Sequence, residues 1–340
     1  MNYIKRFIKI AIILGLPAWV GWFYYSKLSF VHNYDNTVYA KMDYVEHSAD
    51  KPEIIFLGSS RAAFLIDPRV IDSMCHVSSY NLGMPGMNMP ELRMLLRKCV
   101  EEGKKPSILV LNIDPSSFDV KVPAFDFPDF LSYAACDTVI YHAMAFIQPE
   151  YRFKWRYPLY QFRQLSAMND GLKIRALFRS AAALAGSVPG DEKDPARNTG
   201  KRGRTDYKGF DPQYGDYSES IARPFSMEFD EEGVVLLKDI IAFCRLENIR
   251  LILVTAPLYR EYKKIFLNCD SILDRVSREA AVSKTPYFNF VGDPRYSGKE
   301  NYFNFVHLNA FGARKYSLDL GRILQGFVSG GAVTGIDHTH

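Results

Sequence analysis

Two serines and an arginine follow the first buried strand that the sequence predicts. The segment IIFLGSSRAAF (residues 54–64) has four apolar residues, then Gly58-Ser59-Ser60-Arg61, and then a second apolar run. Ligands of α/β folds gather at the carboxyl ends of parallel strands. A loop at such a junction can hold a nucleophilic serine, bind an anion or simply cap a helix.

Three further stretches place polar groups at or beyond the ends of predicted strands. A serine hydroxyl is a weak nucleophile at neutral pH unless a base takes its proton, and histidine is the natural base. His307 stands just before the last predicted helix. The stretches are NLGMPG (81–86), LNIDPSS (111–117) and FNFVHLNAFG (303–312).

The order of these four stretches resembles that of the SGNH or GDSL-type hydrolases. It is most similar to the membrane-anchored envelope branch that includes the D-alanyl transfer proteins of teichoic acid synthesis and the alginate acetylation proteins. There the nucleophile loop reads Gly-Ser-Ser and an H-L-N sequence precedes the last helix. The resemblance implies that Ser60 is the nucleophile, that His307 is the base, and that Ser60, Gly83 and Asn112 supply the oxyanion donors.

Two positions depart from the family pattern. Asn304 stands three residues before His307, where the family has aspartate. Asparagine can orient an imidazole but cannot balance the charge of an imidazolium, so we expect slower chemistry. Asp293 is the nearest other carboxylate in the sequence. Asn112 falls inside the predicted strand, which leaves Asp114 or Ser116 as alternatives for its role.

Arg61 has two possible roles that the sequence leaves open. It can bind an anionic group of the substrate, which is the role we assign to it as a site residue, or it can pair with a local carboxylate. The other residues of the loop also have structural alternatives, because serine is a preferred helix cap and Gly83 suits a tight turn.

The strands and helices that must position these residues alternate along the chain. Short apolar runs bounded by Gly or Pro predict strands, and apolar residues at helical spacing predict helices. This alternation predicts an α/β fold with a doubly wound, flavodoxin-like parallel sheet in three layers. We expect strands at 53–57, 77–83, 107–114, 250–257 and 287–290, and helices at 90–103, 230–248, 260–282 and 310–327.

The alternation stops between residues 115 and 227, too long a stretch for an ordinary crossover. We expect a mostly helical, aromatic-rich insertion here, with a mobile loop at 187–217. The α/β domain then spans residues 52–328, interrupted by this insertion, and residues 329–340 form a flexible tail.

The N-terminus predicts a membrane anchor. Lys5, Arg6 and Lys9 precede an uncharged apolar run at residues 10–26. At about 1.5 Å per residue this run reaches roughly 26 Å, near the lower limit for crossing a bilayer. The cations orient the N-terminus inward. We therefore expect an anchor in residues 1–30, a stalk at 31–51 and an extracytoplasmic domain; a cleaved signal peptide is the rival reading.

Composition excludes several other classes. A net charge of +4 provides no overall field for nucleic acid. The five cysteines have no C-x-x-C spacing, and no P-loop or G-x-G-x-x-G sequence follows the first strand, so we expect no metal or cofactor.

The sequence thus favours a membrane-anchored acyl esterase or O-acyltransferase that acts on a cell-envelope glycan or an acylated sugar. By resemblance, its partner is a polytopic membrane O-acyltransferase. The alternative is a binding or scaffold protein of the same fold with an impaired site.

Overall fold

The computed structural model describes residues 37–119, 137–147, 209–218 and 223–329, together with Ile4, Gly15 and Phe130. The predicted anchor, the tail and most of the insertion lie outside these residues. The chain divides into two units, one of residues 1–40 and 125–200 and the other of residues 41–124 and 201–340. In the first unit, helix α8 (Thr138–Ile147) begins after Asp137, whose Oδ1 accepts a hydrogen bond from the Ile140 N–H at 2.9 Å.

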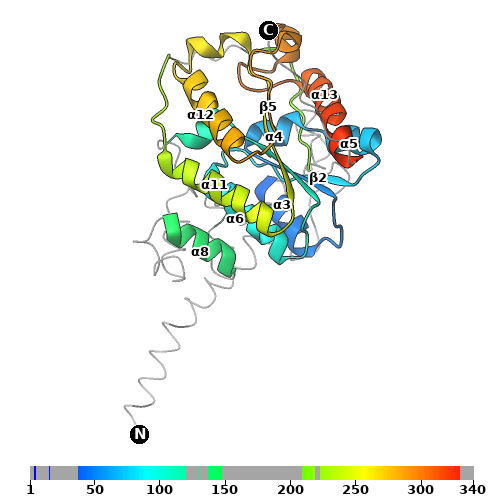
Figure 1. Cartoon of the computed structure of the whole chain (residues 1–340), viewed down its shortest axis with the longest axis vertical. Coiled ribbons are helices and arrows are strands. Elements are labelled where there is room, and N and C mark those ends of the chain that lie inside the picture. Colours follow the sequence, from blue (N-terminus) through cyan, green and yellow to red (C-terminus); the bar gives the residue numbers. More distant parts are fainter. Residues whose placement is uncertain are drawn as a thin grey trace. The chain divides into compact units, whose positions relative to one another are not determined.

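The second unit contains a five-stranded parallel sheet in the order β2-β1-β3-β4-β5 (Figure 1). This is the flavodoxin-like order, so the predicted fold class is confirmed for the sheet. Each strand lies within a predicted range. They are β1 (Ile54–Leu57), β2 (Ser79–Asn81), β3 (Ile108–Asn112), β4 (Arg250–Thr255) and β5 (Tyr287–Asn289).

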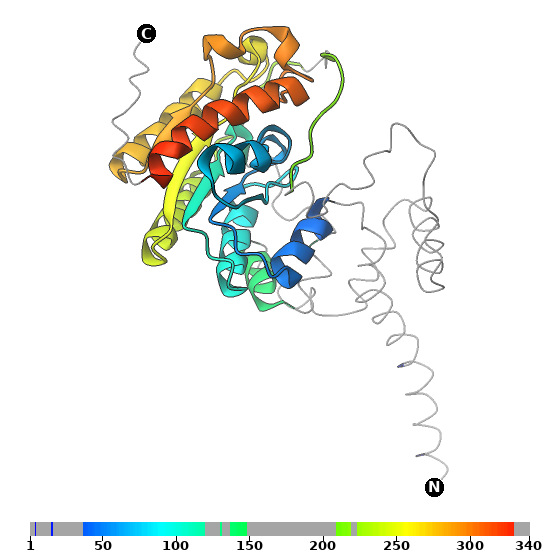
Figure 2. The same ribbon diagram turned by 90° about the vertical axis from the view of Figure 1, so that its right-hand side faces the viewer.

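Helices cover the sheet on both faces. On one face α13 (Ala310–Val328) packs on α4 (Ser60–Leu65) and α5 (Pro68–Cys75), as Figure 2 shows. On the other face α6 (Met89–Glu101) packs on α11 (Glu231–Leu246). Because both faces are covered, the central strands β1 and β3 are wholly buried and consist of apolar residues apart from Asn112.

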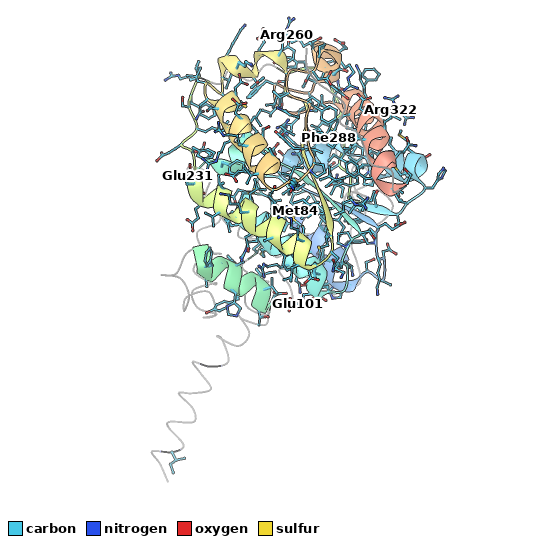
Figure 3. The ribbon with its side chains drawn as sticks, in the orientation of Figure 1. Met84, Glu101, Glu231, Arg260, Phe288 and Arg322 are labelled. Atoms are coloured by element: carbon cyan, nitrogen blue, oxygen red, sulfur yellow. The ribbon has the colours of Figure 1, made fainter. Side chains whose placement is uncertain are left out.

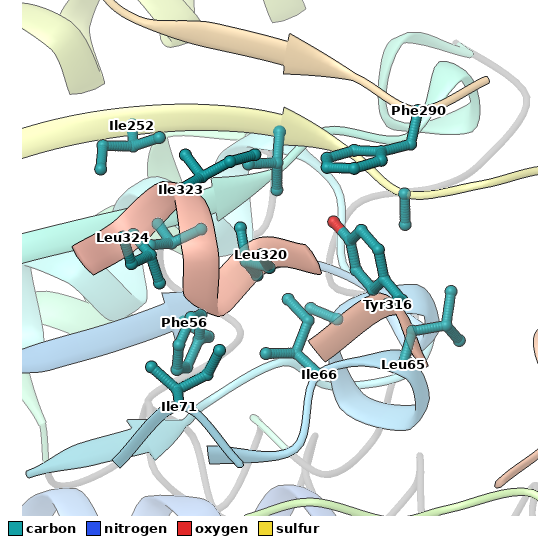
Figure 4. Packing of buried hydrophobic residues seen from close by; sticks show 14 of the residues in the cluster. Phe56, Leu65, Ile66, Ile71, Ile252, Phe290, Tyr316, Leu320, Ile323 and Leu324 are labelled. Carbon is teal, nitrogen blue, oxygen red and sulfur yellow. The ribbon is translucent and has the colours of Figure 1, made fainter. Parts of the chain in front are cut away.

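The larger buried cluster lies between the sheet and α13. Phe56 and Ile252 point from the strands toward Leu320 and Leu324 of α13, while Tyr316 meets Phe290 edge to face at 5.0 Å (Figure 4). Side chains fill the spaces between the ribbons (Figure 3). This packing fixes the start of α13, and therefore the segment before it that carries His307.

Helix α12 begins later than the sequence predicts. The expected helix at 260–282 is a 3₁₀ turn η5 (Arg260–Lys264) followed by α12 (Cys269–Val282). Between them the Phe225 N–H donates to the Ile265 carbonyl at 2.8 Å and the Leu267 N–H to the Phe225 carbonyl at 3.0 Å. These bonds to a distant segment replace the helical ones, which local periodicity could not predict.

Part of the predicted stalk is helical and packs on the sheet unit. Helix α3 (Thr37–His47) buries Met42 and Val45, and the Tyr44 ring stacks on Tyr80 with centroids 3.5 Å apart. None of the helices within the described residues is long and apolar enough to cross a membrane. The predicted anchor itself falls on residues 1–30, of which the structure describes two.

Candidate active site

The nucleophile loop is compact because two glycines let neighbouring backbone approach helix α4. A Cβ on Gly58 would lie 2.7 Å from the Ala62 Cβ, and a Cβ on Gly83 would lie 2.6 Å from the Ala62 Cβ and the Ala63 nitrogen. Side chains at these positions would push the loops after β1 and β2 away from α4. The loops after the first two strands are therefore held together at the carboxyl edge of the sheet.

Ser60 is the first residue of α4 and faces His307. Its Oγ lies 2.8 Å from His307 Nε2, although the residues are 247 apart in sequence. The Phe64 ring, one turn further along α4, meets the imidazole edge to face at 5.4 Å. The structure thus brings together the two residues that the sequence proposes as nucleophile and base.

The loop that carries His307 is closed by its own backbone. The N–H groups of Phe303 and Asn304 donate to the His307 carbonyl at 2.9 and 3.2 Å. The imidazole is half-buried, and its pKa falls from 6.5 to about 4. Burial is the largest cause, the Arg61 guanidinium lowers the pKa further, and the Asp114 carboxylate raises it. His307 is therefore neutral at physiological pH.

Asn304 lies beside the other imidazole nitrogen, where a triad carboxylate would be needed. Its Oδ1 accepts from the backbone N–H groups of Val306 at 3.0 Å and His307 at 2.9 Å. Its Nδ2 lies 3.3 Å from His307 Nδ1. Rotating the amide by half a turn would set the NH₂ group against two N–H donors, so the backbone fixes its orientation.

The orientation of Asn304 determines the tautomer of His307. Since the amide Nδ2 can only donate, Nδ1 accepts, and the single proton of the neutral ring sits on Nε2. Nε2 then donates to Ser60 Oγ instead of accepting its proton. The ring must move its proton to Nδ1, and lose the Asn304 contact, before it can act as a base. Distances suited to a Ser-His pair are present, but the resting tautomer is the unproductive one.

Arg61 is buried beneath the nucleophile loop, and only 4% of the residue is exposed. Its Nη1 donates to Asp114 Oδ1 at 2.7 Å. Its Nη2 donates to the backbone carbonyls of Ala256 and Pro257. Of the two roles that the sequence leaves open, the structure has pairing with a local carboxylate. The assignment to substrate binding is corrected, because the guanidinium has no open surface on which to meet a substrate.

Asn112 is not presented to the site either. The residue is fully buried at the end of β3, its Oδ1 accepts from the Ala256 N–H at 3.1 Å, and its Nδ2 donates to Asp114 Oδ1 at 3.0 Å. Its amide joins β3 to the end of β4, so the oxyanion role is corrected to a structural one. Asp114, one of the alternatives for that role, accepts rather than donates here.

Gly83 lies next to α4 as expected, but its N–H is engaged. It donates to Asn81 Oδ1 at 2.9 Å, while Asn81 Nδ2 donates to the carbonyls of Ala62 and Ile66. The Gly83 carbonyl accepts from the Lys41 ammonium. Of the three expected oxyanion donors, Ser60 remains, because the first N–H of a helix has no carbonyl partner inside that helix.

Two residues of the site, Asp114 and Lys41, make contacts that the sequence analysis did not predict. Asp114 is the buried partner of the nucleophile loop. Its position just beyond an apolar strand indicates a polar site residue, but does not indicate that it pairs with Ser59 and Arg61. Lys41 is fully buried, and burial lowers its pKa to about 7 while Asp211 opposes that effect. Nothing in the predicted stalk marks Lys41. Within the described ranges, no cluster of side chains has the composition of a metal site.

Comparison with known proteins gives no match to a family model and none to a curated protein. Among solved structures, a proposed acylhydrolase from Bacteroides fragilis aligns over 88% of this chain and 97% of its own, with 10% identity and a TM-score of 0.40. A GDSL-like lipase from Bacteroides thetaiotaomicron aligns over 87% and 99%, again with 10% identity and a TM-score of 0.40. Neither alignment identifies the site residues or the substrate of this chain. At 10% identity and a TM-score of 0.40, the two alignments do not assign this chain to a family.

Proposed function

We propose that this protein is a serine-dependent acyl-ester enzyme. The observation that carries the proposal is the 2.8 Å separation of Ser60 Oγ and His307 Nε2 at the carboxyl edge of the sheet. Once the ring proton has moved from Nε2 to Nδ1, Ser60 Oγ attacks the ester carbonyl carbon and His307 Nε2 takes the hydroxyl proton. The bond from carbon to the alcohol oxygen breaks, and the alcohol leaves with the proton from His307. A sugar hydroxyl or water then attacks the acyl-Ser60 ester; its proton passes through His307 to Ser60 Oγ as the bond between the acyl carbon and Ser60 Oγ breaks.

The transition state places negative charge on the ester carbonyl oxygen, which needs hydrogen-bond donors. The Ser60 N–H is one donor at the start of α4. The Gly83 N–H becomes a second one only by leaving Asn81 Oδ1. We expect this exchange to accompany substrate binding.

The substrate class and location remain part of the proposal. The apolar run at residues 10–26, with cations before it, supports an N-terminal membrane anchor and an extracytoplasmic domain. Together with the motif resemblance, this supports an acylated glycan of the cell envelope as substrate and a polytopic membrane O-acyltransferase as partner.

A second function is favoured by Asn304. Its amide fixes the unproductive tautomer of His307, and the low imidazole pKa weakens the base. A protein of this fold that binds an acylated glycan, or supports a partner acyltransferase, needs neither a productive tautomer nor a strong base. This is the binding or scaffold alternative.

Covalent labelling distinguishes the two functions. The full chain in detergent micelles is incubated with a serine-reactive fluorophosphonate, and intact mass is measured for wild type, Ser60→Ala and Asn304→Asp. Ser271→Ala, an exposed serine on α12, is the matched control. Thermal unfolding verifies that each variant is folded.

One adduct on wild type and Ser271→Ala, absent from Ser60→Ala, supports the enzyme. An adduct that forms only with Asn304→Asp supports an impaired site and the binding function. No adduct on any folded variant refutes serine chemistry.

A further inference from the structure

A buried ion pair lies directly under the proposed nucleophile. The side chains of Arg61 and Asp114 are 5% and 2% exposed, and Arg61 Nη1 lies 2.7 Å from Asp114 Oδ1. Arg61 follows Ser60 in the chain, and Asp114 follows β3. Burying two charges is costly, and such a pair adds little stability compared with apolar residues of the same volume. Its position therefore suggests a role other than stability.

The pair joins the loops that follow three strands. On the β1 side, Ser59 Oγ donates to the second oxygen of Asp114 while also capping α4 through the Arg61 N–H. On the β4 side, the guanidinium donates to the carbonyls of Ala256 and Pro257. Both residues that flank Ser60 are thus held by the same carboxylate. The orientation of Ser60 follows from these contacts, since its own side chain faces His307.

The same two groups are the charges that act on His307. The Arg61 cation opposes protonation of the imidazole and the Asp114 anion favours it. The other side chains in contact with the ring come from α4 and the histidine loop. Within the part of the chain that the structure describes, they are Ser60, Phe64 and Asn304, none of which carries a charge. A change in either member of the pair should therefore reach the base as well as the nucleophile.

We infer that Arg61 and Asp114 are positioning residues of the proposed reaction, whose ion pair holds Ser60 against His307 and balances the charge beside the imidazole. The inference rests on the proposed function. It assigns Arg61 to the interior of the site and gives Asp114 a role that the motif resemblance does not provide.

The test separates position from charge by comparing three substitutions of Arg61 and Asp114 in the full chain. Arg61→Lys keeps the cation but loses the two-pronged contact with Asp114 and the backbone carbonyls. Arg61→Gln removes the cation and leaves the Asp114 anion. Asp114→Asn leaves the cation. For each variant we would measure the rate of fluorophosphonate labelling and the midpoint of the His307 titration by NMR, with the ring signal assigned by His307→Gln.

We expect labelling to slow about tenfold to a hundredfold in all three variants, because a misplacement of about 1 Å can cost 10² in rate. The titration midpoint should stay near that of wild type in Arg61→Lys. It should rise in Arg61→Gln and should not rise in Asp114→Asn. Wild-type labelling rates in all three variants, or a midpoint that moves the same way in Arg61→Gln and Asp114→Asn, would overturn the inference.

Two further measurements keep the result decisive. Where single variants unfold, the double variant Arg61→Met/Asp114→Leu removes both charges together, which buried pairs tolerate better. It should fold and still label slowly; labelling at the wild-type rate would refute positioning by the pair. If wild type itself is not labelled, the proposed function fails, whereas the NMR midpoints still decide whether the pair sets the charge at His307.

Discussion

The two halves of the candidate site are held in different ways. The nucleophile loop is fastened by a buried charged network, in which Asp114 binds Ser59 and Arg61 on either side of Ser60. The histidine loop is half-buried and closed by neutral hydrogen bonds, with Asn304 bonded to the backbone on one side and to the imidazole on the other. Hydrogen bonds hold both halves in place, but the two halves contribute differently to the proposed reaction.

The alignment of Ser60 with His307 and the strength of His307 as a base therefore have different structural causes. The charged network and the histidine loop together place Ser60 Oγ and His307 Nε2 at hydrogen-bond distance. Nothing on the histidine side stabilises an imidazolium, because Asn304 is neutral and burial lowers the pKa of the ring to about 4. Within the described residues, the distance between Ser60 Oγ and His307 Nε2 suits a nucleophile and its base, but no carboxylate contacts His307 Nδ1.

The largest expected effect is on the histidine side, from Asn304→Asp. One carboxylate oxygen keeps the two backbone contacts, and the other replaces Nδ2 opposite His307 Nδ1. The ring then carries its proton on Nδ1, and the pKa of His307 rises toward neutrality. We expect fluorophosphonate labelling or ester hydrolysis to accelerate by about 10²- to 10⁴-fold.

The matched control for this change is Asn248→Asp, an exposed asparagine between α11 and β4 at the opposite edge of the sheet. It adds the same charge and should leave the rate within about twofold. Equal rates for Asn304→Asp and wild type would mean that the tautomer does not limit the reaction.

On the nucleophile side, Arg61→Met should strongly destabilise the fold. It leaves the Asp114 carboxylate buried without its cation, and breaking such a pair costs about 3–5 kcal/mol. Denaturant unfolding measures this loss. For comparison, Lys263→Met breaks the exposed pair with Asp270 on the surface and should cost at most about 1 kcal/mol. Similar losses for the two variants would show that the Arg61 pair is less buried in solution than in the structure.

A smaller effect concerns stability against pH. The unfolded chain binds a proton at His307 near pH 6.5, while the folded chain binds it only near pH 4. The unfolded state therefore takes up more protons in this window, and the free energy of unfolding falls as the pH decreases from 6.5 toward 4. Above pH 6.5 the contribution vanishes, because both states are neutral.

His307→Gln should remove this part of the pH dependence, so its unfolding free energy should fall less than that of wild type over the same window. Urea unfolding at several pH values tests this. His47→Gln, on the exposed face of α3, is the control and should behave like wild type. An unchanged slope for His307→Gln would contradict the low pKa of the folded state.

The smallest effect is expected from Asp293→Asn. Asp293 is the nearest carboxylate to the histidine loop in sequence, but its oxygens accept from the backbone and guanidinium of Arg295. The carboxylate that raises the pKa of His307 is that of Asp114. Labelling rates should therefore stay within about twofold of wild type. A tenfold loss would identify Asp293 as the missing triad carboxylate.

Local sequence was sufficient for the five strands, for helices α6, α11 and α13, and for the order of the motifs. Apolar runs identified all five strands of the sheet, and the end of α13 lies within one residue of its predicted position. The pairing of Ser60 with His307 was implied by the resemblance of the motif order to SGNH or GDSL-type hydrolases, and parallel strands do bring their carboxyl ends to one edge. The late start of α12 could not be predicted, because it depends on hydrogen bonds from the chain around Phe225.

The partners within the site were decided by tertiary structure. The sequence by itself determined that Asn304 stands where a carboxylate is expected, but not that two backbone N–H groups fix its amide toward His307. It left Arg61 with two possible roles. The hydrogen bond of Arg61 to the buried Asp114, 53 residues away, shows which of the two the fold uses. Periodicity reports which side of a strand or helix is buried; the direction of a hydrogen bond and the pairing of a charge depend on neighbours that only folding brings together.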